Sequence, residues 1–416
     1  MEIQRDTYLN KLIRSKNNGL IKIITGIRRC GKSYLLFNLF KKHLLEQGIP
    51  KEHIIALALD DIQNKEYRSP DKLYSYVKSQ IKDENMYYLL LDEIQFVPEF
   101  EDVLNGFLHI DNADVYVTGS NSKFLSTDIV TEFRGRGYEI AVHPLSFAEY
   151  FSAYKGKVSE AWKDYYTYGG LPRVLSFSVD EEKMNYLEKL LQEVYIRDIL
   201  EHNDIRNTSE LEELVSLLAS AVGSLTNPHK LEKTFLSVKQ TKISAYTIKS
   251  YIDYFKDAFL VSAATRYDIK GKKYINTPQK YYFEDVGLRN AQLKFRQQEE
   301  THIIENIIFN ELRIRGFNVD VGIVEVNAKQ NERSIRKQLE VDFIANKGNS
   351  RYYVQSAFAM PSAEKRAQEE RPLIKIQDSF KKIIVVGDDI KAKKDEKGIL
   401  TIGITEFLLN ENSLDI

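Results

Sequence analysis

The chain has 416 residues, more than one ordinary hydrophobic core supports, so several domains are expected. Its 59 Lys and Arg and 60 Asp and Glu give a formal charge of −1, which excludes a global positive field that would draw the protein onto nucleic acid. The single cysteine, Cys30, excludes an internal disulfide and a cysteine-cluster zinc site and suits a reducing compartment. With no secretory apolar core and no apolar run of about 20 residues, the sequence predicts a cytoplasmic protein.

In the first third of the chain, short apolar runs alternate with amphipathic stretches. This alternation is typical of a parallel sheet covered by helices. It predicts an α/β P-loop NTPase core with a parallel sheet, to which we assign residues 1–155. Strands are expected at residues 20–25, 53–59, 86–91 and 114–118, with helices at 32–47, 69–82 and 99–109.

A phosphate-binding loop lies between the first of these strands and the first helix. Glycines let such a loop wrap closely around phosphates, its N–H groups and the helix N-terminus supply positive charge, and Lys32 reaches the β and γ phosphates. Ser33 offers its hydroxyl to Mg²⁺. The pattern predicts binding of ATP or a related nucleoside triphosphate by Gly26, Ile27, Arg28, Arg29, Cys30, Gly31, Lys32 and Ser33.

Cys30 precedes the helix N-terminus, a position that tends to lower the pKa of a thiol. One hypothesis is that alkylating Cys30 blocks nucleotide binding; the other is that it is a small packing residue. Arg28 and Arg29 face either the solvent or a partner.

Two acids, Asp92 and Glu93, follow a strongly apolar strand. Asp92 would hold Mg²⁺, directly or through water, and Glu93 would orient and polarise the attacking water. Both could instead cap the following helix. Because Glu93 supplies a base for water, hydrolysis is favoured over a small-molecule kinase.

Further polar residues follow the fourth strand. Asn121 either senses the γ-phosphate and positions water or caps the next helix. Arg134 and Arg136 could stabilise transition-state charge from a neighbouring subunit or a moving lid, or they are ordinary surface charges.

The rest of the chain changes character. Residues 156–205 read as a helical lid or connector with a turn at 168–172. Residues 206–292 resemble a winged helix, because three helix candidates precede a β-rich segment at 259–282. Residues 300–416 form a further α/β domain.

A basic cluster lies beside the third helix candidate, with Glu232 as its one acid. It could neutralise DNA phosphates, or the winged helix could bind a protein partner. Tyr246, Tyr251 and Tyr254 are interpreted as packing residues. The cluster consists of Lys230, Lys233, Lys239, Lys242 and Lys249.

Six motifs, in their order along the chain, resemble those of a prokaryotic AAA-type (extended AAA) ATPase family with a C-terminal domain of unknown function. They are the P-loop, Leu89-Leu-Leu-Asp-Glu-Ile-Gln, Thr118-Gly-Ser-Asn-Ser, Phe133-Arg-Gly-Arg, Pro144-Leu-Ser-Phe-Ala-Glu-Tyr and Tyr168-Gly-Gly-Leu-Pro. The resemblance covers nearly the whole chain. It implies ATP-site roles for Lys32, Ser33, Asp92 and Glu93, and extends to Asn121 and to Arg134 or Arg136.

The same resemblance implies a C-terminal domain similar to PD-(D/E)xK endonucleases. It assigns the acid of the first helix to Glu305, the acid of a strand to Asp342, and the Glu or Gln position of the next strand to Gln355. Ala357 then stands where a lysine is expected. Hydrolysis would then lose charge neutralisation and nucleophile activation unless Lys347 or Lys365 substitutes. We therefore expect a degenerate, vestigial nuclease site.

Taken together, the sequence predicts Mg²⁺-dependent ATP hydrolysis that acts as a conformational switch or motor on a nucleic-acid or protein partner. Two alternatives stay open: an ATP-dependent DNA nuclease, and an ATP-binding interaction protein with little turnover. A homo-oligomer is compatible with either arginine acting between subunits.

Overall fold

The structure is a computed structural model that describes residues 2–119, 135–203, 205, 207–296, 299–330 and 333–416. The chain divides into two compact units, Met1–Pro144 with Asp257–Phe259, and Leu145–Lys256 with Leu260–Ile416. In the described ranges no helix has the length and apolar character needed to cross a membrane.

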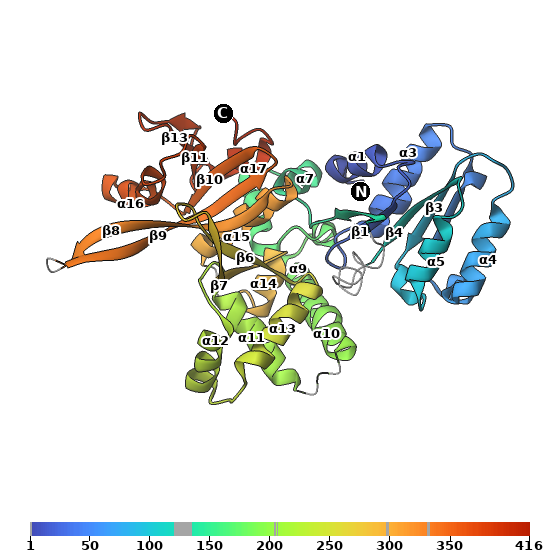
Figure 1. The fold of residues 1–416 in the computed structure, drawn as a ribbon, viewed down its shortest axis with the longest axis horizontal. Coiled ribbons are helices and arrows are strands. Elements are labelled where there is room, and N and C mark those ends of the chain that lie inside the picture. Colours follow the sequence, from blue (N-terminus) through green and yellow to red (C-terminus); the bar gives the residue numbers. More distant parts are fainter. Residues whose placement is uncertain (1, 120–134, 204, 206, 297–298, 331–332) are drawn as a thin grey trace. The chain divides into compact units, whose positions relative to one another are not determined.

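The first unit contains a five-stranded parallel sheet in the order β2-β3-β4-β1-β5 (Figure 1). The four predicted strands are confirmed. The fifth was not predicted, because four of its five residues are exposed and it has no apolar pattern. The strands are β1(Ile21–Thr25), β2(Ile54–Ala58), β3(Tyr87–Asp92), β4(Ala113–Thr118) and β5(Gly137–Ala141).

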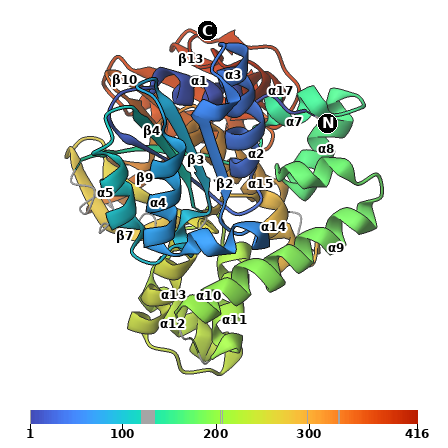
Figure 2. The same ribbon diagram turned by 90° about the vertical axis from the view of Figure 1, so that its right-hand side faces the viewer.

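Helices cover both faces of this sheet (Figures 1 and 2). On one face, Leu73 of α4 and Phe107 of α5 pack into a core with Leu89 and Leu91 of β3. On the other, Phe40 of the π-helical turn η1 contacts Tyr116 of β4, with ring centroids 4.6 Å apart and ring planes tilted by 43°. The helices are α1(Asp6–Arg14), α2(Lys32–Tyr34), η1(Leu35–Phe40), α3(Lys41–Glu46), α4(Pro70–Gln80) and α5(Phe100–Phe107), with 3₁₀ turns η2(Lys51–His53), η3(Ile62–Arg68) and η4(Ile94–Phe96).

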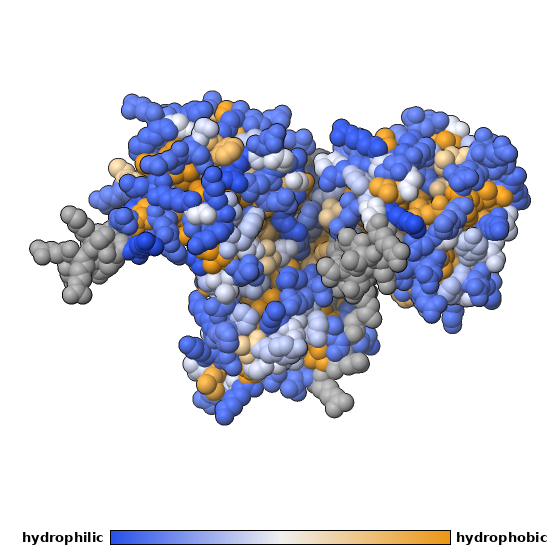
Figure 3. All heavy atoms as spheres, viewed as in Figure 1, coloured by the Kyte–Doolittle hydropathy of each residue, from blue (hydrophilic) through white to orange (hydrophobic). Residues whose placement is uncertain are grey.

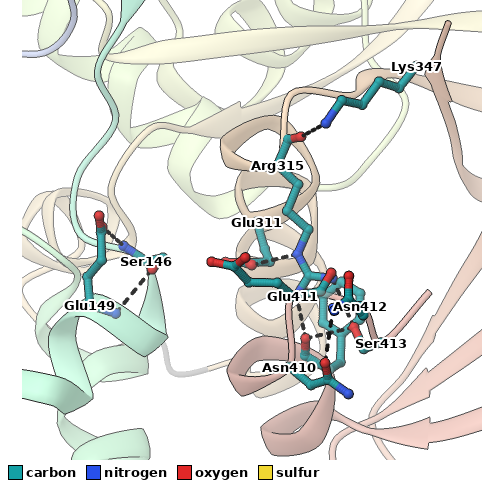
Figure 4. Close-up of polar contacts among 10 residues, drawn as sticks. Ser146, Glu149, Glu311, Arg315, Lys347, Asn410, Glu411, Asn412 and Ser413 are labelled. Atoms are coloured by element: carbon teal, nitrogen blue, oxygen red, sulfur yellow. Dashed lines mark hydrogen bonds and ion pairs between the residues drawn. The ribbon is translucent and has the colours of Figure 1, made fainter. Parts of the chain in front are cut away.

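The second unit begins with helices. A capping box between Ser146 and Glu149 starts α7 (Figure 4). The turn at Gly170 contacts the start of α14, because the Gly170 N–H donates to the Asp285 carboxylate at 2.7 Å. On its other side there is no room for a side chain, since a Cβ on Gly170 would lie 2.4 Å from the Leu145 carbonyl oxygen. The helices are α7(Phe147–Ala153), α8(Val158–Tyr168), η6(Pro172–Ser176), α9(Asp180–Leu190), η7(Leu191–Ile196), α10(Arg197–His202), α11(Thr208–Ser220), α12(Pro228–Thr234), η8(Phe235–Lys239), α13(Ala245–Asp257) and α14(Val286–Gln292).

The second unit also contains a mixed eight-stranded sheet in the order β12-β13-β11-β10-β9-β8-β6-β7. The β6–β7 hairpin, which the sequence assigns to the winged-helix region, extends this sheet because β6 pairs in parallel with β8. The predicted wing and the predicted C-terminal domain therefore share one sheet. Its strands are β6(Val261–Asp268), β7(Lys273–Phe283), β8(Asn318–Gln330), β9(Arg333–Lys347), β10(Ser350–Ala357), β11(Lys381–Val386), β12(Lys393–Lys394) and β13(Ile399–Gly403).

Three helices accompany this sheet: α15(Glu300–Ile314), α16(Ala363–Ile374) and α17(Ile404–Leu409). Phe309 of α15 lies against Phe343 of β9, with ring centroids 6.1 Å apart. Arg315, just after α15, links this helix to the C-terminal segment (Figure 4). Its guanidinium donates to Glu311 of α15 and, at 2.9 Å, to Ser413 Oγ.

Candidate functional site

The phosphate-binding loop follows the carboxyl end of β1 and lies against the main chain after β5. Gly26 has φ +136°, and a Cβ there would lie 2.0 Å from the Val142 carbonyl oxygen. Any side chain at this position would therefore force the loop away from residue 142. The loop ends at Gly31, and α2 begins at Lys32.

The Lys32 ammonium is held inside this loop. Lys32 is 4% exposed, and its Nζ donates to the carbonyl oxygens of Gly26 at 2.8 Å and Ile27 at 3.1 Å. Both acceptors are neutral, and phosphate oxygens are stronger acceptors that can take their place. The lysine is thus pre-positioned at the loop backbone.

Asp92 and Ser33 come together at the same edge of the sheet. The carboxyl ends of β1, β3 and β4 are aligned, Thr118 Oγ1 donates to Asp92 at 2.5 Å, and the Ser33 hydroxyl lies close enough to Asp92 to act on its pKa. Burial raises the pKa of Asp92 above its ordinary value, while the two hydroxyls oppose this shift. Hydroxyl and carboxylate oxygens are the ligands that Mg²⁺ prefers, so this pair fits the ion.

Glu93 lies directly after β3 in the left-handed backbone region, with φ 52°. Its N–H donates to Thr118 Oγ1 at 3.0 Å, and the side-chain amide of Gln95 donates to its carboxylate. Strained backbone of this kind gathers at functional sites. The sequence interpretation missed Thr118 and Gln95 as supporting residues, although both belong to the quoted motifs.

The structure describes one of the three remaining predicted catalytic residues. Asn121 and Arg134 lie outside the described residues. Arg136 is exposed and precedes β5, and its carbonyl accepts the Ile21 N–H at the amino end of β1. Since the P-loop follows the opposite end of β1, about 16 Å away by strand geometry, Arg136 does not reach the site of its own chain.

The other residues of the loop differ in exposure. Arg29 is exposed with φ 65°, whereas Arg28 is half-buried. Cys30 is fully buried, its thiol donates to the Val142 carbonyl at 3.4 Å, and burial raises the pKa of the thiol. The expectation of a lowered thiol pKa is wrong, because desolvation outweighs the charges of Lys32 and Arg5.

A second cluster of charged groups is centred on a lysine that the sequence interpretation missed. Lys280 of β7 is 3% exposed, and its Nζ lies 2.8 Å from Glu305, 2.8 Å from Glu340 and 3.4 Å from Asp342. Burial alone would lower the pKa of Lys280, but the fields of Tyr282 and these three acids outweigh it and raise the pKa well above its ordinary value. Burial raises the pKa of Glu305 to about 7.

A cationic group is therefore present, supplied by β7 rather than by the strand that carries Ala357. Gln355 joins the cluster, since its side-chain oxygen accepts the Asp342 N–H at 3.4 Å and its amide donates to Glu369 at 3.1 Å. Lys365 pairs with Glu369 at 2.5 Å, whereas Lys347 donates to the Arg315 carbonyl. Among the residues that the structure describes, no group of three His, Cys, Asp or Glu is arranged to hold a metal ion.

The predicted basic cluster lies on α12, α13 and the segment between them. Tyr251 is buried, as expected of a packing residue, but Tyr246 is 81% exposed, so that interpretation is wrong for Tyr246. The exposed lysines are Lys230, Lys233, Lys242 and Lys249; the side chain of Lys239 lies outside the described part.

Comparison with known proteins agrees with the geometry of the first unit. Residues 18–151 match an AAA domain family, and residues 159–299 match a domain of unknown function. The first unit is thus an AAA-type ATPase domain with a P-loop and a parallel sheet.

The chain as a whole has relatives along nearly its full length. It is 33% identical over 414 residues to an uncharacterized protein of Haemophilus influenzae, covering 98% of each chain, and it belongs to the same family as that protein. An uncharacterized protein of Methanocaldococcus jannaschii is 29% identical, covering 88% of this chain and 80% of its own length. The Walker-type ATPase of Pyrococcus abyssi is similar with a TM-score of 0.49 and 16% identity, covering 70% of this chain and 96% of that one.

Proposed function

We propose that this protein hydrolyses ATP in a Mg²⁺-dependent reaction and uses the nucleotide state as a conformational switch on a partner. The observation that supports this most is that the Ser33 hydroxyl lies close enough to Asp92 to act on its pKa, while the preceding residue, Lys32, holds a buried ammonium at the loop carbonyls. One loop thus supplies charge for the phosphates next to an oxygen pair suited to the ion.

In this proposal each residue has a separate task. Lys32 would exchange its carbonyl partners for the β and γ phosphates, and Ser33 with Asp92 would hold Mg²⁺, which would supply positive charge to the phosphates. Glu93, oriented through Thr118 and Gln95, accepts a proton from the attacking water. Arg134 or Arg136 could act on the site of a neighbouring copy, and Asn121 remains the proposed γ-phosphate sensor.

The test is phosphate release from the purified full-length chain with Mg²⁺ or with EDTA. Glu93→Gln should bind a fluorescent ATP analogue and release little phosphate, while Lys32→Ala should lose binding. Retained turnover in Glu93→Gln would refute Glu93 as the base, and absence of nucleotide binding by the wild-type protein would refute the function.

A nucleic-acid partner is proposed for the basic cluster. In the region of α11, α12 and α13, the face shown in Figure 3 is mostly hydrophilic with isolated apolar residues. Exposed lysines beside the exposed Tyr246 suit phosphates and bases. Affinity for DNA should then fall steeply with salt and weaken in the double variant Lys242→Glu, Lys249→Glu.

A protein partner is the second candidate, because Leu236 and Val238 beside the same lysines are 53% and 66% exposed. Binding that depends on these two aliphatic residues and not on salt would favour it. Nuclease activity is not proposed, since Lys280 already engages the acids that would hold a metal ion.

A further inference from the structure

Arg5, which lies before the matched AAA domain, is buried against the phosphate-binding loop. It is 4% exposed, and its guanidinium donates from Nη1 to the Cys30 carbonyl at 3.0 Å and from Nη2 to the His143 carbonyl at 2.7 Å. One rigid, planar group therefore bridges the loop and the segment that follows β5.

Other contacts hold the same two segments together. The Cys30 thiol donates to the Val142 carbonyl, and the missing Cβ of Gly26 leaves room for that same oxygen. Tyr8 Oη accepts the His143 N–H at 3.2 Å, and the Arg5 guanidinium lies over the Tyr8 ring, 4.6 Å from its centroid. A shift of the loop therefore cannot leave residues 142–143 unchanged.

Residue 143 lies two positions before the first anchor of the second unit. There the Leu145 N–H donates to the Gly170 carbonyl at 2.8 Å, and the Tyr165 hydroxyl donates to the Leu145 carbonyl at 2.8 Å. Pro144, whose φ is fixed by its ring, is the one residue between the two anchors. A single residue thus joins the segment that contacts the loop to the first anchored residue of the second unit.

We infer that Arg5 is a positioning residue that couples the phosphate-binding loop to residues 142–144, the covalent exit from the ATPase domain. The inference rests on the proposed nucleotide binding. When Lys32 leaves the carbonyls of Gly26 and Ile27 for a phosphate, the loop backbone must readjust. Arg5 passes that readjustment from Cys30 to His143, and Pro144 carries it to Leu145.

The test measures backbone hydrogen exchange in the peptides that cover residues 140–146, with and without Mg²⁺ and a non-hydrolysable ATP analogue. It uses the full chain, the variants Arg5→Met and Arg5→Lys, and the matched control Arg14→Met, which changes an exposed arginine at the far end of α1, the helix that follows Arg5. The wild type and the control should show a nucleotide-dependent change in exchange. Arg5→Met should lose that change and bind the analogue about tenfold more weakly, the loss expected for a charge-assisted hydrogen bond.

The outcomes separate the coupling from the proposed function. Absence of analogue binding by the wild type would overturn both, whereas binding without any change in exchange at residues 140–146 would overturn the coupling alone. If Arg5→Met does not fold, Arg5→Lys decides, because lysine keeps the charge but lacks the planar fork. Wild-type affinity together with a wild-type exchange response in Arg5→Lys would overturn the inference.

Discussion

Lys32 and Lys280 are both buried lysines, yet the groups that contact their ammonium nitrogens differ. Lys32 donates to two main-chain carbonyls, and the Asp92 carboxylate at the same edge of the sheet accepts a hydrogen bond from Thr118. Lys280 contacts three carboxylates directly. The Lys32 ammonium thus has neutral acceptors, whereas the charges around Lys280 neutralise one another.

The difference shows that residue types alone do not define a site. A cation that already has ionic partners must give them up before it can bind an anionic ligand, and this costs several kcal/mol in a buried cluster. A cation held by neutral acceptors gains when phosphate replaces them. The partners of each lysine therefore distinguish the proposed phosphate site from an internal ion-pair cluster.

The largest expected effect is on the proposed nucleotide site. Glu93→Gln should lower the rate of phosphate release by about 10³-fold, because the amide cannot accept the proton of the attacking water. Steady-state phosphate release and analogue binding are the measurements, with Glu99→Gln as a control at a second left-handed glutamate of the same unit. A comparable loss in Glu99→Gln would mean that backbone strain, and not base chemistry, explains the effect.

Removing the cation of the second cluster should act on stability. Lys280→Met leaves Glu305, Glu340 and Asp342 without their shared ammonium and should lower the free energy of unfolding of the second unit by about 3–5 kcal/mol. Lys365→Met, which removes a lysine that is 41% exposed, should cost about 1 kcal/mol or less. Denaturant titration compares them.

The view of the Lys280 cluster as an internal ion-pair cluster would be wrong if the wild type nicked plasmid DNA with Mg²⁺ or Mn²⁺. Loss of such nicking in Asp342→Ala would show that the cluster opens to a metal ion in spite of Lys280. We expect no nicking by either protein.

Asp285 is a buried carboxylate of another kind, because it is main-chain N–H groups that bond it. Burial raises the pKa of Asp285 to about 6, and the N–H groups of Gly170 and Leu288 oppose the shift. As the pH rises, the Asp285 carboxyl loses its proton in the unfolded state before it does so in the folded state. Its contribution to the free energy of unfolding is therefore complete below the ordinary pKa of an aspartic acid and is lost as the pH rises through about 6. The loss amounts to about 3 kcal/mol. Denaturant titrations from pH 4 to 7 should show a flatter dependence in Asp285→Asn than in the wild type.

Gln95 should have a smaller effect on turnover. Its amide donates to the Glu93 carboxylate, so Gln95→Ala removes the support of the proposed base and should lower kcat about tenfold while KM stays close to that of the wild type. Gln80→Ala on α4 is the control. A change in KM alone would indicate a role in binding instead.

The smallest effect is expected at Cys30. Because the thiol is fully buried and its pKa is raised, it should react slowly with an alkylating reagent in the folded protein. Labelling followed by mass spectrometry checks this, with denatured protein as the reference. Rapid labelling would show that the loop opens without nucleotide.

The ATPase unit could be predicted from sequence because its signals are local. Strand, glycine loop and helix follow one another at residues 21–34, and Asp92 ends an apolar strand, so parallel pairing brings both to one edge. The placement of Arg136 could not be predicted, because its distance from the loop of its own chain depends on the position of β5 in the sheet, where an exposed strand leaves no pattern.

Arg5 and Lys280 could not be found in this way. Arg5 reaches its carbonyl partners across 25 and 138 residues of sequence, and Lys280 is 62 residues from Asp342. Long-range partners of this kind leave no periodicity, and an arginine or lysine read alone looks like a surface charge.

The pairing of β6 with β8 has a consequence for how this protein can be divided. The matched domain of unknown function ends at residue 299, yet Arg266, Tyr267 and Asp268 pair with residues 321–323 beyond it. A fragment that stops at 299 would leave an open strand edge, which favours aggregation, and Lys280 without its acids. Recombination that separated the two segments would face the same penalty, so we expect both to be inherited as one block.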